Sequence, residues 1–148
     1  MRLSKNQSPL PPFDRPSALR SRNMAAIRSK DTKPELTVRR ALHSTGFRFR
    51  LRPSALPGRV DLVLPRYRRV VFIHGCFWHG HNCRVAHTPK TNSEYWSAKI
   101  QRNVVRDARN RDLLEGCGWE VTTIWECNLV DDLSDLITKL EDQRRGSA

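Results

Sequence analysis

Residues 70–83 read VVFIHGCFWHGHNC, an apolar run that passes directly into a cluster of histidine, cysteine and aromatic side chains. The run over residues 70–73 is apolar at every position, which predicts a strand buried on both faces at the centre of a sheet. Residues 74–83 hold three of the five histidines and two of the four cysteines of the chain. Packing rarely requires such a density, so this segment indicates a functional site at the end of the central strand.

Helix and strand patterns extend from this stretch in both directions. Thr32 is expected to cap a helix that ends at Gly46, and Thr91 with Glu94 has capping-box spacing at the start of a helix reaching about residue 116. A final helix is expected over roughly residues 131–143. The strand candidates span residues 47–51, 60–64, 70–73 and 121–126. The order of these elements predicts an α/β protein.

The length of 148 residues favours one folded domain, which we expect over residues 24–143. Residues 1–23 are rich in proline, serine and arginine and are expected to form a flexible basic arm, and residues 144–148 a tail. The net charge is +12, and residues 1–60 carry 14 basic and 3 acidic side chains. This positive field favours a polyanion, of which nucleic acid is the commonest.

The hydrophobic pattern of the sequence argues against a membrane protein and against a secreted one. The sequence contains no run of about 18 apolar residues and no basic amphipathic helix with a broad apolar face, so no membrane partner is expected. The N-terminal residues lack the apolar core of a signal peptide, which favours the cytoplasm. In that reducing compartment, the four cysteines are expected to be thiols or metal ligands rather than disulfides.

Cys76, His81 and Cys83 have the spacing of three zinc ligands, and Cys127 is the natural fourth ligand. Cys127 follows a predicted strand that could lie beside residues 70–73 in one sheet. Such a site would be structural and would cross-link the two strand ends. Buried cysteines also serve as small apolar core residues, which is the alternative for this group and the preferred interpretation of Cys117.

Asp61 lies within an apolar strand pattern, where an unpaired buried carboxylate would cost several kcal/mol. A divalent metal would remove that cost, although an aspartate in a strand is more often structural. Hydrolysis of a phosphodiester needs a metal, a base and an acid or cation near the leaving oxygen, and Asp61, His79 and His74 could fill these roles. Glu35 is either a first-turn residue favoured by the helix dipole or a group that orients a metal-bound water or a histidine. Asp107 is either part of a solvated helix face or a support for a histidine.

With these residues considered, the chain resembles the very short patch repair endonucleases, bacterial enzymes that nick DNA beside a T:G mismatch left by deamination of 5-methylcytosine. The resemblance runs from about Met24 to Leu129. It is carried by the motifs MAAIR at 24–28, KPEL at 33–36, PGRVD at 57–61, HGCFWHGHNC at 74–83, EYW at 94–96 with Lys99, Ile100 and Asn103, GW at 118–119 and WEC at 125–127.

The resemblance implies a restriction-endonuclease-like fold of the PD-(D/E)xK type, in which helices flank a mixed sheet. It also implies catalytic Mg²⁺ bound by Asp61 and the main-chain carbonyl of Ile73, a position where some members carry threonine. The remaining implied roles are a base that activates water (His79), assistance at the metal-bound water and phosphate (Glu35 and His74), a residue that orients a histidine (Asp107), and ligands of a structural Zn²⁺ (Cys76, His81, Cys83 and Cys127).

The aromatic side chains of the motif have two interpretations. In the family that the chain resembles, such residues wedge into the duplex beside the mismatch, and Phe77, Trp78 and Trp96 are suited to stack on bases. Alternatively, they form a hydrophobic clamp under the zinc loop. The basic arm is expected to contact the DNA backbone.

The predicted function is Mg²⁺-dependent nicking of one strand of double-stranded DNA, 5′ to the T of a T:G mismatch. The alternatives are a restriction-type nuclease of the same fold with other specificity and a non-catalytic, zinc-stabilised DNA-binding module. One active site that nicks one strand needs no dimer, so we expect a monomer. From the resemblance we expect the protein in the bacterial cytoplasm, associated with the nucleoid. Mismatch-repair proteins are candidate partners.

Overall fold

The computed structural model describes residues 10–11, 31–81, 83 and 91–146. The arm expected over residues 1–23 lies outside the described residues, apart from residues 10 and 11. Within the described ranges, the structure contains α2 (Lys33–Ser44), β1 (Arg50–Leu51), β2 (Leu62–Leu64), β3 (Arg69–His74), α3 (Ser93–Gly116), β4 (Glu120–Trp125) and α4 (Leu129–Gly146), with short 3-10 turns at Pro65–Tyr67 and Glu126–Asn128. The predicted order of helices and strands is therefore confirmed.

The strands form one mixed sheet in the order β1-β2-β3-β4. β1 pairs with β2 and β2 with β3 in antiparallel fashion, whereas β3 and β4 are parallel. All six residues of β3 are buried, which confirms the central strand predicted from its unbroken apolar run. The parallel register places His74 opposite Trp125, so β3 and β4 end together.

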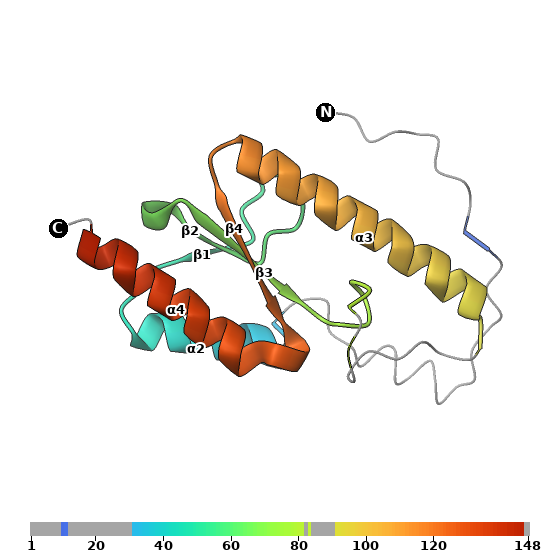
Figure 1. Ribbon diagram of the computed structural model, residues 1–148, viewed down its shortest axis with the longest axis horizontal. Helices are drawn as coiled ribbons and strands as arrows, with labels where there is room; N and C mark the ends of the chain where they lie inside the picture. The colour runs from blue at the N-terminus through green and yellow to red at the C-terminus, as the bar shows by residue number, and fades with distance from the viewer. Residues whose placement is uncertain (1–9, 12–30, 82, 84–90, 147–148) are drawn as a thin grey trace.

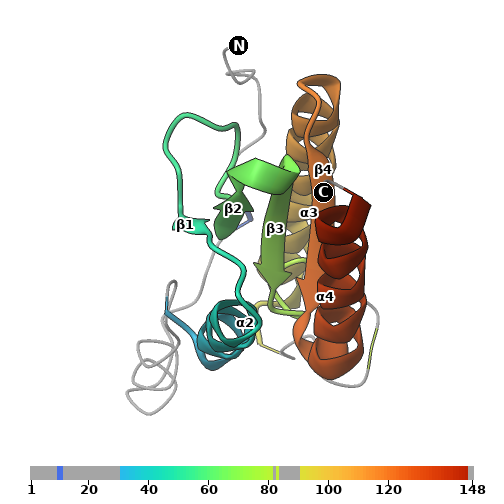
Figure 2. The same cartoon turned by 90° about the vertical axis from the view of Figure 1, so that its left-hand side faces the viewer.

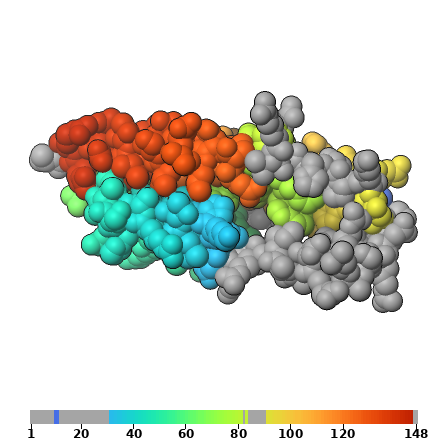
Figure 3. Space-filling view, turned by 90° about the horizontal axis from the view of Figure 1, so that it is seen from below, coloured from blue at the N-terminus to red at the C-terminus, as the bar shows by residue number. Residues whose placement is uncertain are grey.

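Helices cover both faces of the sheet. α2 and α4 lie side by side on one face, and α3 covers the other and continues past the end of the sheet (Figures 1, 2 and 3). Alternate residues of β3 point into a hydrophobic core on each face of the sheet. Val71 and Ile73 pack with Leu42 of α2 and Leu136 of α4. On the other face, Phe72 packs with Leu114 of α3. None of the described helices has the length and hydrophobicity needed to cross a bilayer.

The boundaries of α2 follow the predicted signals. The Thr32 hydroxyl accepts a hydrogen bond from the Glu35 amide at 3.4 Å. At the other end Gly46 adopts a left-handed conformation with φ of +89°, and the Phe47 amide donates to the Leu42 carbonyl at 2.9 Å. This is the hydrogen-bond pattern of a Schellman motif, which strongly favours glycine at this position.

The capping box predicted at Thr91 is wrong. α3 begins at Ser93 with Asn92 as its N-cap, and the Asn92 side chain makes no capping hydrogen bond. Asn92 has a φ of +58°, a left-handed conformation that asparagine tolerates better than most residues. Its carbonyl accepts the first helical hydrogen bond, from the Trp96 amide at 3.0 Å.

Asp61 lies one residue before β2 rather than inside a strand, and this corrects the expected strand over residues 60–64. The backbone pairing of β2 with β3 ends at Leu62. Beyond it, the Asp61 side chain, rather than a backbone carbonyl, accepts the next hydrogen bond from β3. Its Oδ2 accepts a hydrogen bond from the Ile73 amide at 2.6 Å. The strand expected over residues 47–51 is likewise reduced to Arg50–Leu51.

Candidate active site and metal centre

The candidate site lies where β3 and β4 end. Because these strands are parallel and in register, the segment that follows His74 and the turn that follows Trp125 meet at the same edge of the sheet. α3 runs past this edge (Figure 1). The topology therefore gathers residues from two strand ends and one helix.

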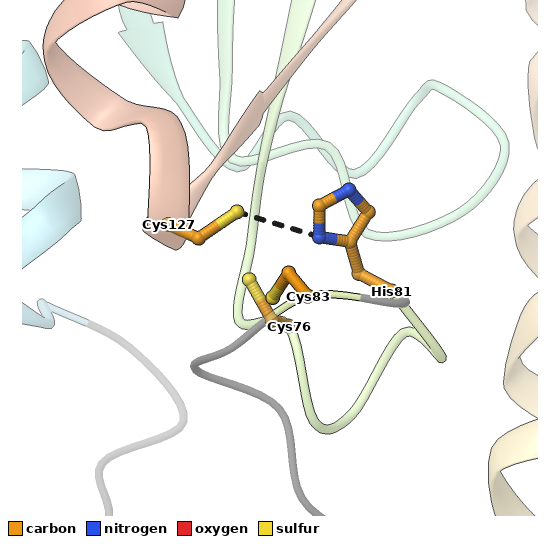
Figure 4. A group of neighbouring side chains, drawn as sticks. All are labelled: Cys76, His81, Cys83 and Cys127. Carbon is orange, nitrogen blue, oxygen red and sulfur yellow. Dashed lines mark hydrogen bonds between the residues drawn. The ribbon is translucent and has the colours of Figure 1, made fainter.

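Four side chains form a cluster with metal-binding chemistry at this edge. Cys76, His81, Cys83 and Cys127 each offer one ligand atom, and these atoms lie within 4.8 Å of one another. The Cys127 Sγ lies 3.4 Å from the His81 Nδ1, and the Cys76 and Cys83 sulfurs lie close by (Figure 4). The predicted four residues thus come together, whereas Cys117 is exposed at the end of α3.

The donor set fits a structural Zn²⁺. Three sulfurs and one ring nitrogen converge, which matches a Cys3His tetrahedral site. Burial raises the pKa of the Cys76 thiol to about 12, which disfavours the thiolate. A thiolate at this position therefore needs a bound cation to stabilise it. The structure therefore contains a group of ligands suited to a metal that prefers sulfur and nitrogen.

The segment that carries these ligands is folded tightly against α3. The His81 amide donates to the Cys76 carbonyl at 3.0 Å, and the Asn103 side chain donates to the Trp78 carbonyl at 2.9 Å. Gly80 has a φ of +66°, and a Cβ placed on it would lie 2.7 Å from the Val104 side chain. Only glycine allows the segment to approach the helix this closely.

Asp61 is a partly buried carboxylate whose side chain contacts the end of β3. Burial raises its pKa to about 6, and the negative charge of Glu35 acts in the same direction. The hydrogen bond from the Ile73 amide and the charges of Arg52 and His79 only partly oppose this rise. The Asp61 carboxylate thus lacks sufficient compensating charge, as expected of a ligand that receives a metal ion.

In magnesium-free buffer, Asp61→Asn is expected to raise the free energy of unfolding near pH 7 by up to about 3 kcal/mol. Asparagine keeps an acceptor for the Ile73 amide and removes the buried charge. Because the pKa of Asp61 is raised on folding to about 6, the native state binds more protons than the unfolded state. Wild-type stability should therefore be complete at about pH 4 and fall as the pH rises to about 7.

Denaturant unfolding at several pH values measures this difference. The difference in the free energy of unfolding between wild type and variant should increase with rising pH and be absent at about pH 4. A gap that is independent of pH would contradict the raised pKa.

Glu35 anchors a network of arginines next to Asp61. It is 4% exposed, and its Oε2 accepts hydrogen bonds from Arg52 at 2.9 Å and Arg39 at 3.2 Å. Both arginines also reach Asp31, and the hydrogen bonds from them lower the pKa of the Asp31 carboxyl. Glu35 is therefore more than a first-turn residue favoured by the helix dipole.

His79 and Asp107 form a direct pair. The His79 Nδ1 and the Asp107 Oδ2 lie 2.5 Å apart, so a residue of α3 orients the imidazole of the segment after β3. The His74 ring stacks on the His79 ring with centroids 3.6 Å apart and planes within 2°. Burial lowers the pKa of His74 to about 3, which makes it a neutral imidazole beneath His79.

Three aromatic side chains pack together on the outer side of the site. Phe77 and Trp78 have centroids 4.9 Å apart, and both make edge contacts with Trp96. Trp96 is 6% exposed, whereas the other two are half-buried. The Lys99 Nζ lies 5.9 Å from the Trp78 centroid. In this conformation the buried Trp96 ring supports the more exposed rings of Phe77 and Trp78. The clamp under the zinc loop and the intercalation both stay predictions.

The sequence pattern assigned no role to the arginine network, and it included Trp125 only as part of the WEC motif. Arg39 follows Glu35 by four residues, a helical spacing that could have indicated the ion pair. Arg52 is in an irregular turn with a φ of +39°, and no local pattern predicts that its guanidinium reaches Glu35. Trp125 stacks on His81 with centroids 4.1 Å apart and so connects the metal cluster to the sheet.

Comparison with known proteins gives a consistent result. The family model described as DNA mismatch endonuclease Vsr matches residues 14–85. The type II nicking enzyme V.XorIIP of Xanthomonas oryzae is 51% identical over 73% of this chain and 79% of the relative. The type II nicking enzyme V.NmeAIP of Neisseria meningitidis is 48% identical over 74% and 79% of the two chains.

The DNA mismatch endonuclease Vsr of Escherichia coli is 46% identical over 76% of this chain and 72% of its own length. The match to the family model includes Glu35, Asp61 and both stacked histidines. A divalent metal is implied by a nuclease of this kind, and the structure offers ligands for one. The chain belongs to the Vsr family of DNA mismatch endonucleases, enzymes that hydrolyse phosphodiester bonds in DNA.

Proposed function

We propose that this endonuclease nicks the T-containing strand of a T:G mismatch, on the 5′ side of the T, and that it requires Mg²⁺. The mismatch would arise by deamination of 5-methylcytosine. The proposal is supported by the similarity to the DNA mismatch endonuclease Vsr of Escherichia coli and by the motifs that the chain has in common with very short patch repair enzymes. The observation that carries it is the placement of Asp61 near a histidine that a second carboxylate orients.

The Asp61 carboxylate and the Ile73 carbonyl are the proposed Mg²⁺ ligands. The Ile73 amide points toward Asp61, and in an antiparallel strand the carbonyl of the same residue points to the same side. Both ligands are oxygens, which Mg²⁺ prefers. When bound, the ion would offset the negative charge that develops on the scissile phosphate.

His79 is the proposed general base. Its Nδ1 is held by Asp107, so the other ring nitrogen, Nε2, is the one that takes a proton from the attacking water. Asp107 fixes the ring orientation and stabilises the imidazolium that forms. His74, buried and neutral, keeps the plane of the His79 ring in place by stacking.

The arginine network is proposed to act on the phosphate side of the site. Arg52 is partly exposed and its charge acts on Asp61, so it places a cation next to the metal-binding carboxylate. Glu35 holds that guanidinium at 2.9 Å. In this proposal Glu35 assists at the metal-bound water and phosphate mainly through the cation that it positions.

We propose that Cys76, His81, Cys83 and Cys127 hold a structural Zn²⁺. The ion would cross-link the segment after β3 to the turn after β4. His79 lies inside that segment, between Cys76 and His81, and would be fixed by the same cross-link. The structural metal would thereby contribute to catalysis through position alone.

Phe77 and Trp78 are the proposed wedge at the mismatch. Both rings are half-buried and lie beside Trp96, and the Lys99 ammonium lies over the Trp78 ring. Stacking of one base on one aromatic ring contributes roughly 1–3 kcal/mol. We further propose that the protein acts as a monomer at the bacterial nucleoid, that its basic arm contacts the DNA backbone, and that mismatch-repair proteins are its partners.

Nicking of matched duplexes tests this function. Duplexes that differ only in T:G, C:G or T:A at one position, labelled on each strand, are incubated with the protein in Mg²⁺ and in magnesium-free buffer. Omitting the ion is preferable to adding a chelator, which can also remove zinc. The proposal predicts nicking of the T strand of the T:G duplex alone, and only with Mg²⁺. Equal nicking of all three duplexes would favour a restriction-type nuclease of the same fold.

A further inference from the structure

A second group of potential metal ligands lies beside the cysteine cluster. His74, His79 and Asp107 each offer one ligand atom, and these three atoms lie within 4.8 Å of one another. A tetrahedral ion with bonds of about 2.1 Å separates its ligand atoms by roughly 3.4 Å. For both imidazoles to reach one ion, the stacked rings of His74 and His79 would have to tilt toward each other.

One ring nitrogen of His74 lacks a hydrogen-bond partner among the described residues. The His74 side chain is 7% exposed, and its Nδ1 makes no hydrogen bond to any described residue. A buried ring nitrogen without a partner is energetically unfavourable. A bound cation at this nitrogen would remove that cost.

The other two ligands are open to solvent. The His79 and Asp107 side chains are 21% and 24% exposed, so an ion can enter the group from their side. Two imidazole nitrogens and one carboxylate oxygen suit Zn²⁺, Co²⁺ or Ni²⁺, whereas Mg²⁺ prefers a set made of oxygens. The ligand chemistry thus differs both from the cysteine cluster and from the oxygen ligands proposed for Mg²⁺.

We propose that His74, His79 and Asp107 form a second transition-metal site, which binds a Zn²⁺-type ion and blocks nicking when it is filled. The ion takes the place of the proton between the His79 Nδ1 and the Asp107 Oδ2, and that proton is released to the solvent. His79 can then no longer be oriented by Asp107 as a base. Binding rests on the geometry alone, while inhibition rests on the function proposed above.

Metal titration of the purified protein, with its cysteine cluster already loaded, tests the binding step. Wild type, Asp107→Asn and Asp112→Asn are titrated with Co²⁺ and, in parallel, with Zn²⁺ by calorimetry. Asp112 is an exposed aspartate of the same helix, so its variant matches the change in charge without touching the group. Cobalt bound to cysteine gives strong thiolate-to-metal charge-transfer absorption, and cobalt bound to histidine and aspartate does not, which separates the two sites.

We expect wild type and Asp112→Asn to bind one further ion without thiolate absorption, and Asp107→Asn to bind it at least about 10-fold more weakly. Unfolding curves verify that the Asp107 variant is folded. No further ion in wild type, or equal binding by Asp107→Asn, would overturn the proposed site.

Nicking measured at fixed Mg²⁺ with rising Zn²⁺ tests the inhibition. Nicking by wild type and Asp112→Asn should fall in proportion to the filling of the second site. Undiminished nicking at full occupancy would overturn the inhibitory role. If wild type does not nick before Zn²⁺ is added, the proposed function fails, while the titrations still decide whether the second site exists.

Discussion

Replacing His79 with alanine is expected to lower the single-turnover nicking rate by about 10²–10⁴-fold, because positioned general bases contribute rate enhancements of this size. His79 is the imidazole that Asp107 holds at 2.5 Å and that lies close enough to Asp61 for their charges to interact. DNA affinity should change little, since most of it comes from contacts between basic side chains and phosphates. Rapid-quench nicking and equilibrium binding of the same T:G duplex measure the two quantities.

A histidine outside the site provides the control. His43 is an exposed residue in the last turn of α2, and His43→Ala should nick at the wild-type rate. The nicking rate of Asp107→Asn should lie between those of His79→Ala and His43→Ala, because this variant keeps the His79 imidazole but weakens its orientation. A His79→Ala rate equal to that of the His43 control would remove His79 from the proposed mechanism.

Replacing Cys127 with serine is expected to release the proposed structural Zn²⁺ and to lower both stability and activity. Apparent binding energies of structural zinc reach about 10–16 kcal/mol in small domains, so loss of one of four ligands removes a large stabilising term. The segment that carries His79 would lose its link to the turn after β4. Metal content per chain, thermal unfolding and nicking of the T:G duplex measure the three consequences.

Cys117→Ser is the matched control for this experiment. Cys117 is exposed at the C-terminal end of α3 and lies outside the cluster. The control should keep one metal ion per chain and the wild-type unfolding temperature. If Cys127→Ser retains its metal and unfolds like the control, the fourth ligand has been assigned incorrectly.

Much of the fold could be predicted because its strongest patterns are local. The unbroken apolar run of β3 indicated the central strand, and Thr32 and Gly46 bounded α2 because capping chemistry needs particular side chains at particular positions. The conformation of Asn92 was not predictable in this way. Its left-handed backbone sets the start of α3 one residue later than the sequence pattern of Thr91 suggested.

The metal cluster could be assembled from sequence because one inference about topology was sufficient. If the strand before Cys127 lies beside β3, its end must meet the segment after β3. The surroundings of Asp61 could not be predicted in the same way. Arg52 reaches Glu35 across 17 positions of sequence. The His74 ring packs against Phe72, His79 and Trp125, and its Nδ1 has no hydrogen-bond partner in the part of the chain that the structure describes. Such contacts depend on the tertiary structure and leave no periodic pattern.

The central claim, that a cation bound at Asp61 drives nicking, is tested most directly by Asp61→Asn. The T-strand nicking rate of a T:G duplex is measured across a Mg²⁺ titration for wild type and variant, with DNA affinity measured on the same preparations. We predict that wild type nicks with a rate that saturates in Mg²⁺, and that Asp61→Asn binds the duplex as tightly but does not nick at any Mg²⁺ concentration. Mg²⁺-dependent nicking by Asp61→Asn at the wild-type rate would contradict the account.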